Sequence, residues 1–207
     1  IYAGLDGLID SQGNQFWNAS VACCNFNANP VDDAAYIQGL IDEISKKVSV
    51  DPKRIYLFGH SNGHFMSYKF ACTYPETVAA IAGLAGAMDS APSNCGATSP
   101  VNVLHIHGTN DDVINYDGGQ ILGNIFTSAQ ESAKRWASVN QCSLNPSVGT
   151  AFDLIASLDG KETIPTIYSC PSASAELWTI EGGSHGPSLD SSFALQVMDW
   201  LLAHPKG

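Results

Sequence analysis

A serine lies between two glycines in the segment Gly59-His60-Ser61-Asn62-Gly63. This G-x-S-x-G pattern follows the apolar run Ile55–Phe58, which predicts a strand, and precedes a predicted helix. A tight strand-to-helix turn would hold Ser61 in a strained conformation, and the helix N-terminus would place positive partial charge beside it. The N–H of Asn62 would then face an oxyanion formed during acyl transfer. The pattern therefore predicts Ser61 as a nucleophile and Asn62 as part of an oxyanion hole.

A carboxylate and a histidine follow later strands, in the order that such a nucleophile needs. A serine hydroxyl is a weak nucleophile and requires a base, which in turn requires an orienting carboxylate. The predicted strand Val101–His107 leads into a polar loop, so we expect Asp111 in this loop to be the acid, with Asp112 as the alternative. A glycine-rich loop after the last predicted strand carries His185. His185 is therefore the expected general base.

The remaining histidines receive structural interpretations. His105 and His107 alternate with apolar residues on one predicted strand, so we expect both to be structural and His107 to brace the acid loop by hydrogen bonding. His60 and His64 flank Ser61, and His64 is a candidate for lining a substrate cleft. No set of histidine, cysteine and aspartate has the spacing of a metal site, and no glycine loop suits phosphate. We expect neither a metal nor another cofactor.

The periodicity of apolar residues predicts strands that alternate with helices along the chain. The expected helices are Asp33–Val48 with Asp32 as N-cap, Asn62–Cys72, a helix from the capping box at Ser128 to about Val139, and Phe193–Ala203. The expected strands are Ile1–Asp6 before a long polar loop, Arg54–Phe58, Val78–Leu84, Val101–His107, Thr163–Ser169 and Glu176–Ile180. This alternation predicts an α/β fold with a mostly parallel sheet, helices on both faces and the site at the carboxyl edge.

Length and charge limit the classes of protein that fit. The 207 residues, 44% of them hydrophobic, suffice for one domain with a sizeable core, and we expect a single catalytic domain over residues 1–207. The formal net charge of −11 would repel a polyanion, so we expect no nucleic-acid partner. No apolar run is long enough to cross a membrane, and no membrane partner is expected. A neutral ester or polyester substrate fits this charge, and we expect a monomer.

Six cysteines are present without any C-x-x-C pair, which argues against zinc or thioredoxin chemistry. They are Cys23, Cys24, Cys72, Cys95, Cys142 and Cys170. Such a number in a chain of this size favours disulfides and an oxidising compartment, and hence a secreted or periplasmic protein. Counting alone leaves about 15 possible pairings open.

Five segments together resemble the polyhydroxybutyrate depolymerase/feruloyl esterase group of secreted α/β-hydrolases. They are Phe58-Gly-His-Ser-Asn-Gly63, Ala71-Cys-Thr-Tyr-Pro75, Ala82-Gly-Leu-Ala-Gly-Ala-Met88, His107-Gly-Thr-Asn-Asp111 and Gly182-Gly-Ser-His185. The resemblance extends from Ile1 to about Leu202. It implies an α/β-hydrolase fold without a cofactor, and a catalytic triad of Ser61, Asp111 and His185.

The resemblance also implies substrate contacts and disulfides. Trp17 and the neighbouring pair Cys23-Cys24 match a segment near the cleft, where Trp17 could stack on an acyl or aromatic group. Family cysteines at the positions of Cys142 and Cys170 imply a disulfide that closes a loop of about 27 residues. For the other four cysteines, pairing of Cys24 with Cys72 is one option, with Cys23 as a competitor and Cys95 able to pair with either.

This sequence departs from the family at its start. Members begin with additional strands, including an HG segment whose following loop supplies the second oxyanion N–H. Here Ile1–Gly7 matches a later strand, so we expect the first strands of the fold and that donor to be absent from this sequence.

The functional hypothesis is a secreted serine carboxylic ester hydrolase that works through an acyl-enzyme. The expected substrates are a polyester, either polyhydroxybutyrate-like or an aromatic polyester such as PET, or a feruloyl-type ester. Two alternatives stay open: a peptidase or thioesterase with the same triad, and a catalytically weak binding protein.

Overall fold

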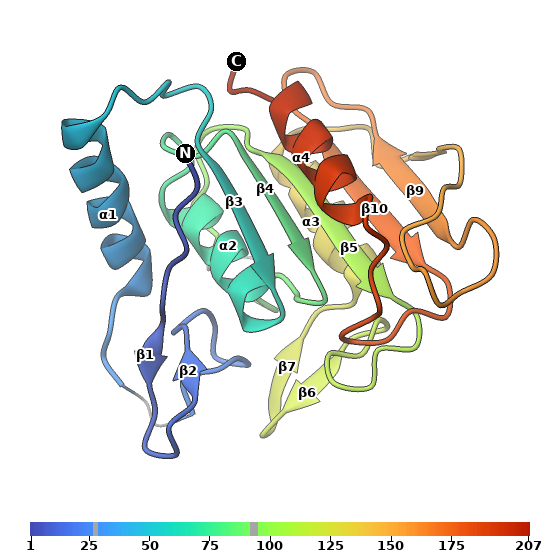
Figure 1. Cartoon of the computed structure of the whole chain (residues 1–207), viewed down its shortest axis with the longest axis horizontal. Coiled ribbons are helices and arrows are strands. Elements are labelled where there is room, and N and C mark those ends of the chain that lie inside the picture. Colours follow the sequence, from blue (N-terminus) through green and yellow to red (C-terminus); the bar gives the residue numbers. More distant parts are fainter. Residues whose placement is uncertain (27–28, 92–94) are drawn as a thin grey trace.

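A six-stranded sheet forms the centre of the computed structural model, which describes residues 1–26, 29–91 and 95–207. Its strand order is β3 (Tyr56–His60), β4 (Ala80–Leu84), β5 (Asn102–Gly108), β10 (Ala175–Ile180), β9 (Thr163–Tyr168) and β8 (Ser147–Val148). The first four strands are parallel, whereas β9 runs antiparallel to both of its neighbours. The prediction of a mostly parallel sheet is therefore confirmed (Figure 1).

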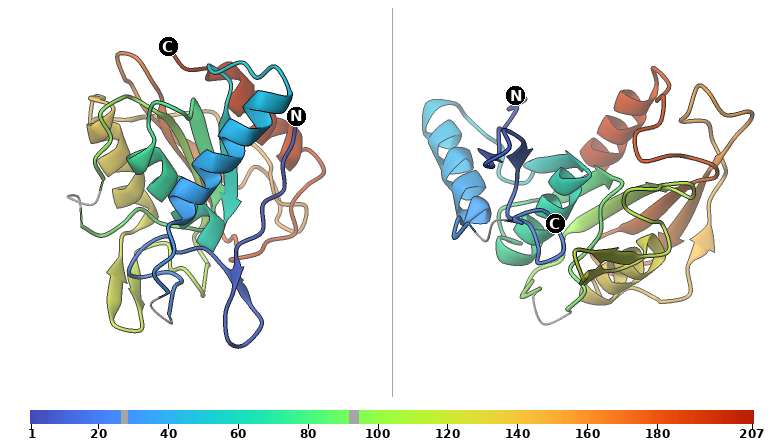
Figure 2. Two further views of the ribbon diagram at one scale, coloured as in Figure 1. Left: turned by 90° about the vertical axis from the view of Figure 1, so that its left-hand side faces the viewer. Right: turned by 90° about the horizontal axis from the view of Figure 1, so that it is seen from below.

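Four helices cover the sheet: α1 (Asp33–Lys47), α2 (Asn62–Thr73), α3 (Ala129–Val139) and α4 (Phe193–Ala203). Side chains along a strand point alternately to its two faces. In β4, Ala82 and Leu84 pack with α4, whereas Ile81 packs with α2 and α3. The sheet therefore has a core on each face, with α3 and α4 on opposite sides (Figures 1 and 2).

The four predicted helices are confirmed, each ending within one residue of its expected limit. The carboxylate of Asp32 accepts the N–H of Ala35, and the hydroxyl of Ser128 accepts the N–H of Glu131, so both predicted N-caps are present. The side chain of Glu131 bonds to Arg135 at 2.7 Å instead of completing a capping box. Among the described residues, no helix is long and apolar enough to cross a bilayer.

The prediction of a strand at Ile1–Asp6 is wrong. Residues 1–7 form no strand, the side chains of Ile1 and Tyr2 are exposed, and the only pairing there joins β1 (Leu8–Ile9) to β2 (Gln15–Phe16). An extended segment needs a neighbouring strand for its backbone hydrogen bonds. β3 is the edge strand of the sheet, and among the described residues it pairs with β4 alone. The backbone of residues 1–7 therefore stays irregular.

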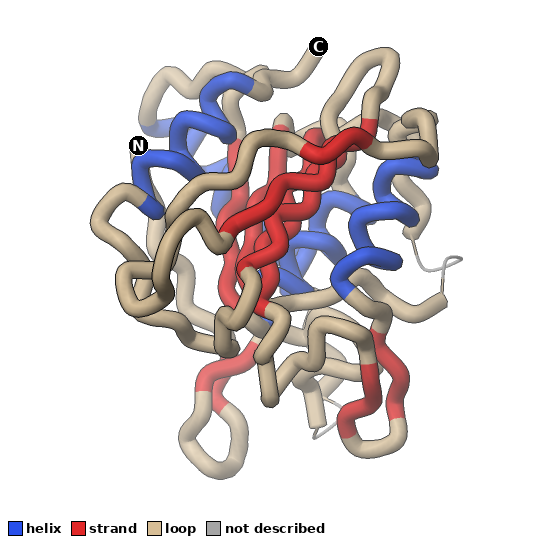
Figure 3. The backbone as a smooth tube through the Cα atoms, turned by 90° about the vertical axis from the view of Figure 1, so that its right-hand side faces the viewer, coloured by secondary structure: helices blue, strands red, loops and turns tan. Residues whose placement is uncertain are grey.

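A second hairpin was not predicted either. It joins β6 (Gly119–Ile121) to β7 (Asn124–Phe126) through Leu122 and Gly123, which both have positive φ. Strands of two or three residues are too short to show a period in the sequence. Both hairpins lie beyond the carboxyl ends of the parallel strands (Figures 1 and 3).

The disulfides confirm one pairing and correct another. Cys142 is bonded to Cys170, as the family resemblance implied. The option of Cys24 with Cys72 is wrong, because Cys72 at the end of α2 is bonded to Cys95 and the adjacent Cys23 and Cys24 are bonded to each other. No described cysteine is free.

The Cys142–Cys170 disulfide links the end of α3 to the segment after β9, across a sequence separation of 28. Replacing both residues with serine removes this constraint from the unfolded chain. We expect the free energy of unfolding to fall by roughly 3–4 kcal/mol. Urea unfolding followed by circular dichroism measures the change, with the Cys72→Ser/Cys95→Ser variant for comparison. An unchanged midpoint would show that the bond adds no stability.

Candidate active site

Ser61 occupies a sharp turn between β3 and α2. Its backbone has φ 53° and ψ −121°, outside the regions that residues with a side chain ordinarily adopt. A Cβ at Gly59 would lie 2.2 Å from the carbonyl of Gly63, so strand and helix approach this closely only because residue 59 is glycine. The N–H of Ser61 donates to the carbonyl of Leu84 at 2.8 Å. The turn is therefore fixed to β4 and presents the Ser61 side chain at the carboxyl edge.

The three residues predicted as a triad lie within hydrogen-bonding distance of one another. Ser61 Oγ is 3.0 Å from His185 Nε2. His185 Nδ1 is 2.9 Å from Asp111 Oδ2 and 3.1 Å from Asp111 Oδ1. Because a carboxylate only accepts, Nδ1 of His185 carries the proton and Nε2 is free to accept the Ser61 hydroxyl. This is the arrangement that activates a serine.

The carboxylate of Asp111 is buried, with 2% of the residue exposed. Burial alone would raise its pKa, but hydrogen bonds from His107 and His185 and from the N–H groups of Val113 and Ile114 outweigh it and hold the pKa well below its usual range. Asp111 therefore stays charged at neutral pH. The alternative, Asp112, is exposed beside it, and no hydrogen bond joins it to His185.

The acid loop and the histidine loop are in direct contact. A Cβ at Gly108 would lie 2.1 Å from the carbonyl of Gly183, so this approach requires glycine. The N–H of Asn110 donates to that same carbonyl at 2.9 Å, and the N–H of Gly182 donates to Thr109 Oγ1 at 2.8 Å. These contacts fix the histidine loop relative to Asp111.

His60 is a site residue that sequence reasoning missed. Its Nε2 donates to the backbone carbonyl of His185 at 2.8 Å, and the two rings are 5.0 Å apart. The contact spans 125 residues of sequence, so position next to Ser61 was the one signal available. This contact attaches the backbone of His185 to the end of β3.

Asn62 uses its backbone and its side chain differently. Its N–H is at the start of α2, where helix N–H groups have no partner within the helix, and its role as oxyanion donor stays a prediction. Its side chain accepts the N–H of Trp17 at 2.6 Å and donates to the Trp17 carbonyl at 3.0 Å. The segment around Trp17 is therefore attached to the turn that carries Ser61.

The two predicted substrate-binding residues have different outcomes. The ring of Trp17 is partly buried and stacks on Tyr36 of α1 at 6.5 Å, and its contact with substrate stays a prediction. The prediction that His64 lines a cleft is wrong, because its side chain is fully buried. One turn after Ser61, this position of α2 faces the sheet, and the ring packs between Tyr68 and His105. Burial lowers the pKa of His64 well below its ordinary range.

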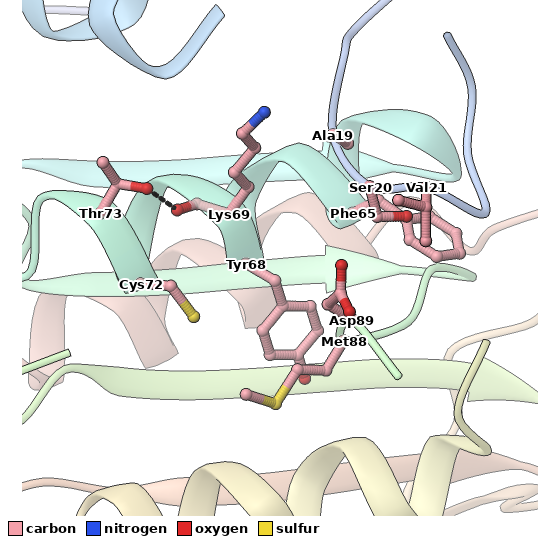
Figure 4. A pocket seen from close by; sticks show the side chains of 10 residues that line it. All are labelled: Ala19, Ser20, Val21, Phe65, Tyr68, Lys69, Cys72, Thr73, Met88 and Asp89. Carbon is pink, nitrogen blue, oxygen red and sulfur yellow. Dashed lines mark hydrogen bonds between the residues drawn. The ribbon is translucent and has the colours of Figure 1, made fainter. Parts of the chain in front are cut away.

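A cavity of about 370 Å³ lies beside the site, against α2. Figure 4 shows Phe65 next to Ser20 and Val21, and Tyr68 next to Met88 and Asp89. Ser61, Trp17 and His64 are not among its lining residues, so it is a neighbouring cavity and not the space above Ser61. No group of three or more His, Cys, Asp or Glu side chains within residues 1–26, 29–91 and 95–207 could hold a metal ion.

The sheet order, the turn at Ser61 and the Ser61–His185–Asp111 contacts together define an α/β-hydrolase. A family model confirms this class. The chain belongs to the phospholipase/carboxylesterase family, whose model matches residues 27–147, more than half of the chain.

Individual relatives are similar over most of this chain. Feruloyl esterase B of Piromyces equi is 34% identical over 160 residues, which are 72% of this chain and 28% of that protein. Feruloyl esterase D of Neurospora crassa is 26% identical over 157 residues, 76% of this chain and 48% of that protein. The chain therefore spans less than half the length of both relatives.

The fold has a solved counterpart. An acetyl xylan esterase from Aspergillus awamori superimposes with a TM-score of 0.59 at 17% identity, over 82% of this chain and 66% of that chain. At this identity the likeness concerns the fold alone.

Asp111 and Asp112 provide a matched pair of variants. Asp111→Asn leaves the shape but removes the acceptor that holds the proton on Nδ1 of His185, so we expect kcat to fall by about 10³–10⁴-fold. Asp112→Asn changes an exposed side chain, and we expect a change of less than about threefold. Turnover of a short p-nitrophenyl ester measures both. A larger loss for Asp112→Asn would reverse the assignment of the acid.

Two buried histidines make stability depend on pH. Burial lowers the pKa of His64 and of His105 well below the ordinary value, so the unfolded chain binds protons below pH 6.5 that the folded chain does not. The free energy of unfolding should therefore fall as pH decreases from 7 to 5. Each histidine contributes a slope of at most about 1.4 kcal/mol per pH unit.

Urea unfolding at a series of pH values measures this slope. His64→Phe is the comparison, since it keeps an aromatic ring without the titrating group and should reduce the slope. A stability that stays constant between pH 7 and 5 in the native chain would contradict the prediction.

Proposed function

We propose that this chain is a serine carboxylic ester hydrolase that works through an acyl-enzyme on Ser61. The observation that carries the proposal is the continuous contact from Ser61 Oγ to His185 Nε2, 3.0 Å, and from His185 Nδ1 to Asp111 Oδ2, 2.9 Å. Each residue has the chemical state that its role needs: an accepting imidazole nitrogen, a charged carboxylate and a hydroxyl at a strained turn.

The reaction follows from these states. His185 Nε2 takes the Ser61 proton as Oγ attacks the ester carbonyl, and the tetrahedral oxyanion accepts the N–H of Asn62 at the positive end of α2. His185 then gives its proton to the leaving alcohol, which leaves an ester on Ser61. Water, deprotonated by His185, attacks this ester, and Ser61 recovers its proton as the acid departs. Asp111 stays ionised throughout and stabilises the imidazolium.

The proposed substrate class is an ester of a phenolic acid. Relatives named feruloyl esterase support this class over the polyester substrates that the sequence left equally open. The acidic balance of −11 is compatible with a neutral ester. Three disulfides support an oxidising, extracellular environment, and we propose that residues 1–207 act there as one catalytic domain.

The nucleophile has a direct test. Ser61→Ala removes the attacking oxygen, and we expect kcat on a short p-nitrophenyl ester to fall by roughly 10⁵–10⁶-fold. An unchanged circular dichroism spectrum would show that the fold persists. Labelling by a fluorophosphonate probe should occur in the native chain and disappear in the variant. Parent-level turnover by purified Ser61→Ala would rule out Ser61 as the nucleophile.

The substrate class needs its own comparison. The native chain is assayed for kcat/KM on methyl ferulate and on p-nitrophenyl acetate, and for release of acid from a polyhydroxybutyrate film. The proposal expects the highest kcat/KM on methyl ferulate and no acid from the film. Faster release from the film would replace the phenolic ester by a polyester.

A further inference from the structure

A line of buried side chains continues from the acid into the core. Tyr68 of α2 and His105 and His107 of β5 are each no more than 1% exposed. Tyr68 Oη lies 2.9 Å from His105 Nδ1, and His105 Nε2 lies 3.0 Å from His107 Nδ1. His107 Nε2 lies 3.1 Å from Asp111 Oδ2. We call Tyr68, His105 and His107 the buried polar set.

The direction of the hydrogen bonds follows from the acceptors at one end. His107 Nε2 contacts a carboxylate and, at 2.8 Å, the carbonyl of Ile114, neither of which can donate. Nε2 of His107 therefore carries a proton. With a neutral ring, its Nδ1 accepts from His105 Nε2, and His105 Nδ1 accepts from the hydroxyl of Tyr68. Every donor in the set then points toward Asp111.

The environment keeps two members of the set neutral. Burial lowers the pKa of His105 well below its ordinary range and raises that of Tyr68. The Tyr68 hydroxyl therefore remains a donor and His105 remains uncharged at neutral pH. The ring of His64 stacks on Tyr68 and lies tilted against His105, and its nitrogens have no hydrogen-bond partner among the described residues.

We propose that the buried polar set is a positioning device for the acid of the triad: His107 donates to Asp111 Oδ2, and Tyr68 and His105 fix the ring of His107 for that purpose. The inference rests on the proposed function, because it concerns the acid of that mechanism. No proton passes along the set. Its effect is to spread the negative charge of Asp111 and to hold the carboxylate toward His185 Nδ1.

Removing the His107 donor has a defined consequence. A carboxylate with one hydrogen bond fewer in the same buried position binds a proton more readily. The coupled pair of Asp111 and His185 then takes up its proton at higher pH, whichever residue receives it. Since ester hydrolysis needs a charged Asp111 and an accepting His185, the acid limb of the kcat/KM profile should move to higher pH.

Other titratable groups lie close enough to matter for such a profile. They are His60 at the end of β3, His64 on α2, Tyr116 after β5, the exposed Asp112, and Glu181 after β10. Tyr116 meets the His107 ring edge-on at 5.7 Å, and the charge of Glu181 raises the pKa of Tyr116. His60 is the one in contact with His185, so each profile is also measured with His60→Gln present. The shift caused by the His107 variant should be the same in both backgrounds.

The experiment compares His107→Leu with His107→Gln in the whole chain, using a p-nitrophenyl ester between pH 4.5 and 9. Leucine fills the space without a donor, whereas the amide nitrogen of glutamine reaches the position of Nε2. For His107→Leu we expect kcat to fall roughly tenfold to a hundredfold at pH 7, with KM unchanged and the acid limb about one pH unit higher. His107→Gln should recover most of the rate and bring the acid limb of the profile back to the pH of the native chain. His204→Leu, a histidine change in the C-terminal tail, should alter neither.

Equal losses in His107→Leu and His107→Gln, or a loss without a shift of the acid limb, would overturn the proposal and leave His107 a packing residue. If His107→Leu does not fold, Tyr68→Phe takes its place, and it should move the limb in the same direction by a smaller amount. If the acid limb of a folded Tyr68→Phe protein lies at the same pH as in the native chain, the proposal is overturned as well.

A readout without turnover separates this inference from the proposed function. In ¹⁵N spectra of the native chain at pH 7, His105 and His107 should both show the Nε2–H tautomer. The ¹³C signal of the Asp111 carboxyl should titrate at higher pH in His107→Leu than in the native chain. A native chain that folds but cleaves no ester would refute the proposed function alone. An Nδ1–H tautomer at His105 or His107 would refute the buried polar set alone.

Discussion

The charge on Asp111 is the constraint on which the rest of the site depends. A buried carboxylate is costly unless it accepts hydrogen bonds, and Asp111 accepts them from two backbone N–H groups and two histidines. Those donors come from the loop that follows β5, from β5 itself and from the loop that follows β10. The parallel pairing of β5 with β10 is what brings the two loops together, so the sheet and the charge support one another.

The two faces of the sheet have different chemistry. Residues i and i+2 of a strand share a face, so His105 and His107 lie on the side of β5 that meets α2. Leu104 and Ile106 point the other way, into the apolar core beneath α4. The two buried histidines of β5 are therefore on the face that also carries α2. The opposite face, beneath α4, is mostly aliphatic and aromatic, and its packing stabilises the sheet.

Much of this organisation could be predicted from the sequence, because the longer elements have strong periods and each residue of the predicted triad follows a strand. Ser61, Asp111 and His185 could be found one by one, since each stands in a recognisable turn or loop. The contact of His60 with the His185 carbonyl could not be found, because it depends on how two loops distant in sequence meet. His107 was expected to brace the acid loop. The hydrogen bonds that connect His107 through His105 to Tyr68 could not be predicted, because they depend on how α2 packs against β5. The same packing of α2 turns His64 toward the sheet. Helical spacing alone had also allowed His64 to face a cleft.

Strand β4 carries none of Ser61, Asp111 and His185, yet it lies between the strands that lead into Ser61 and into the loop of Asp111. Two strand spacings separate β3 from β5 by roughly 9–10 Å. An imidazole ring with a hydrogen bond at either end fits this gap, and His185 occupies it with contacts of 3.0 Å and 2.9 Å. The spacing of the strands therefore sets the distance that His185 spans between Ser61 and Asp111. Because the sheet fixes this spacing, the loops beyond the strands can differ in length without changing the distance between β3 and β5.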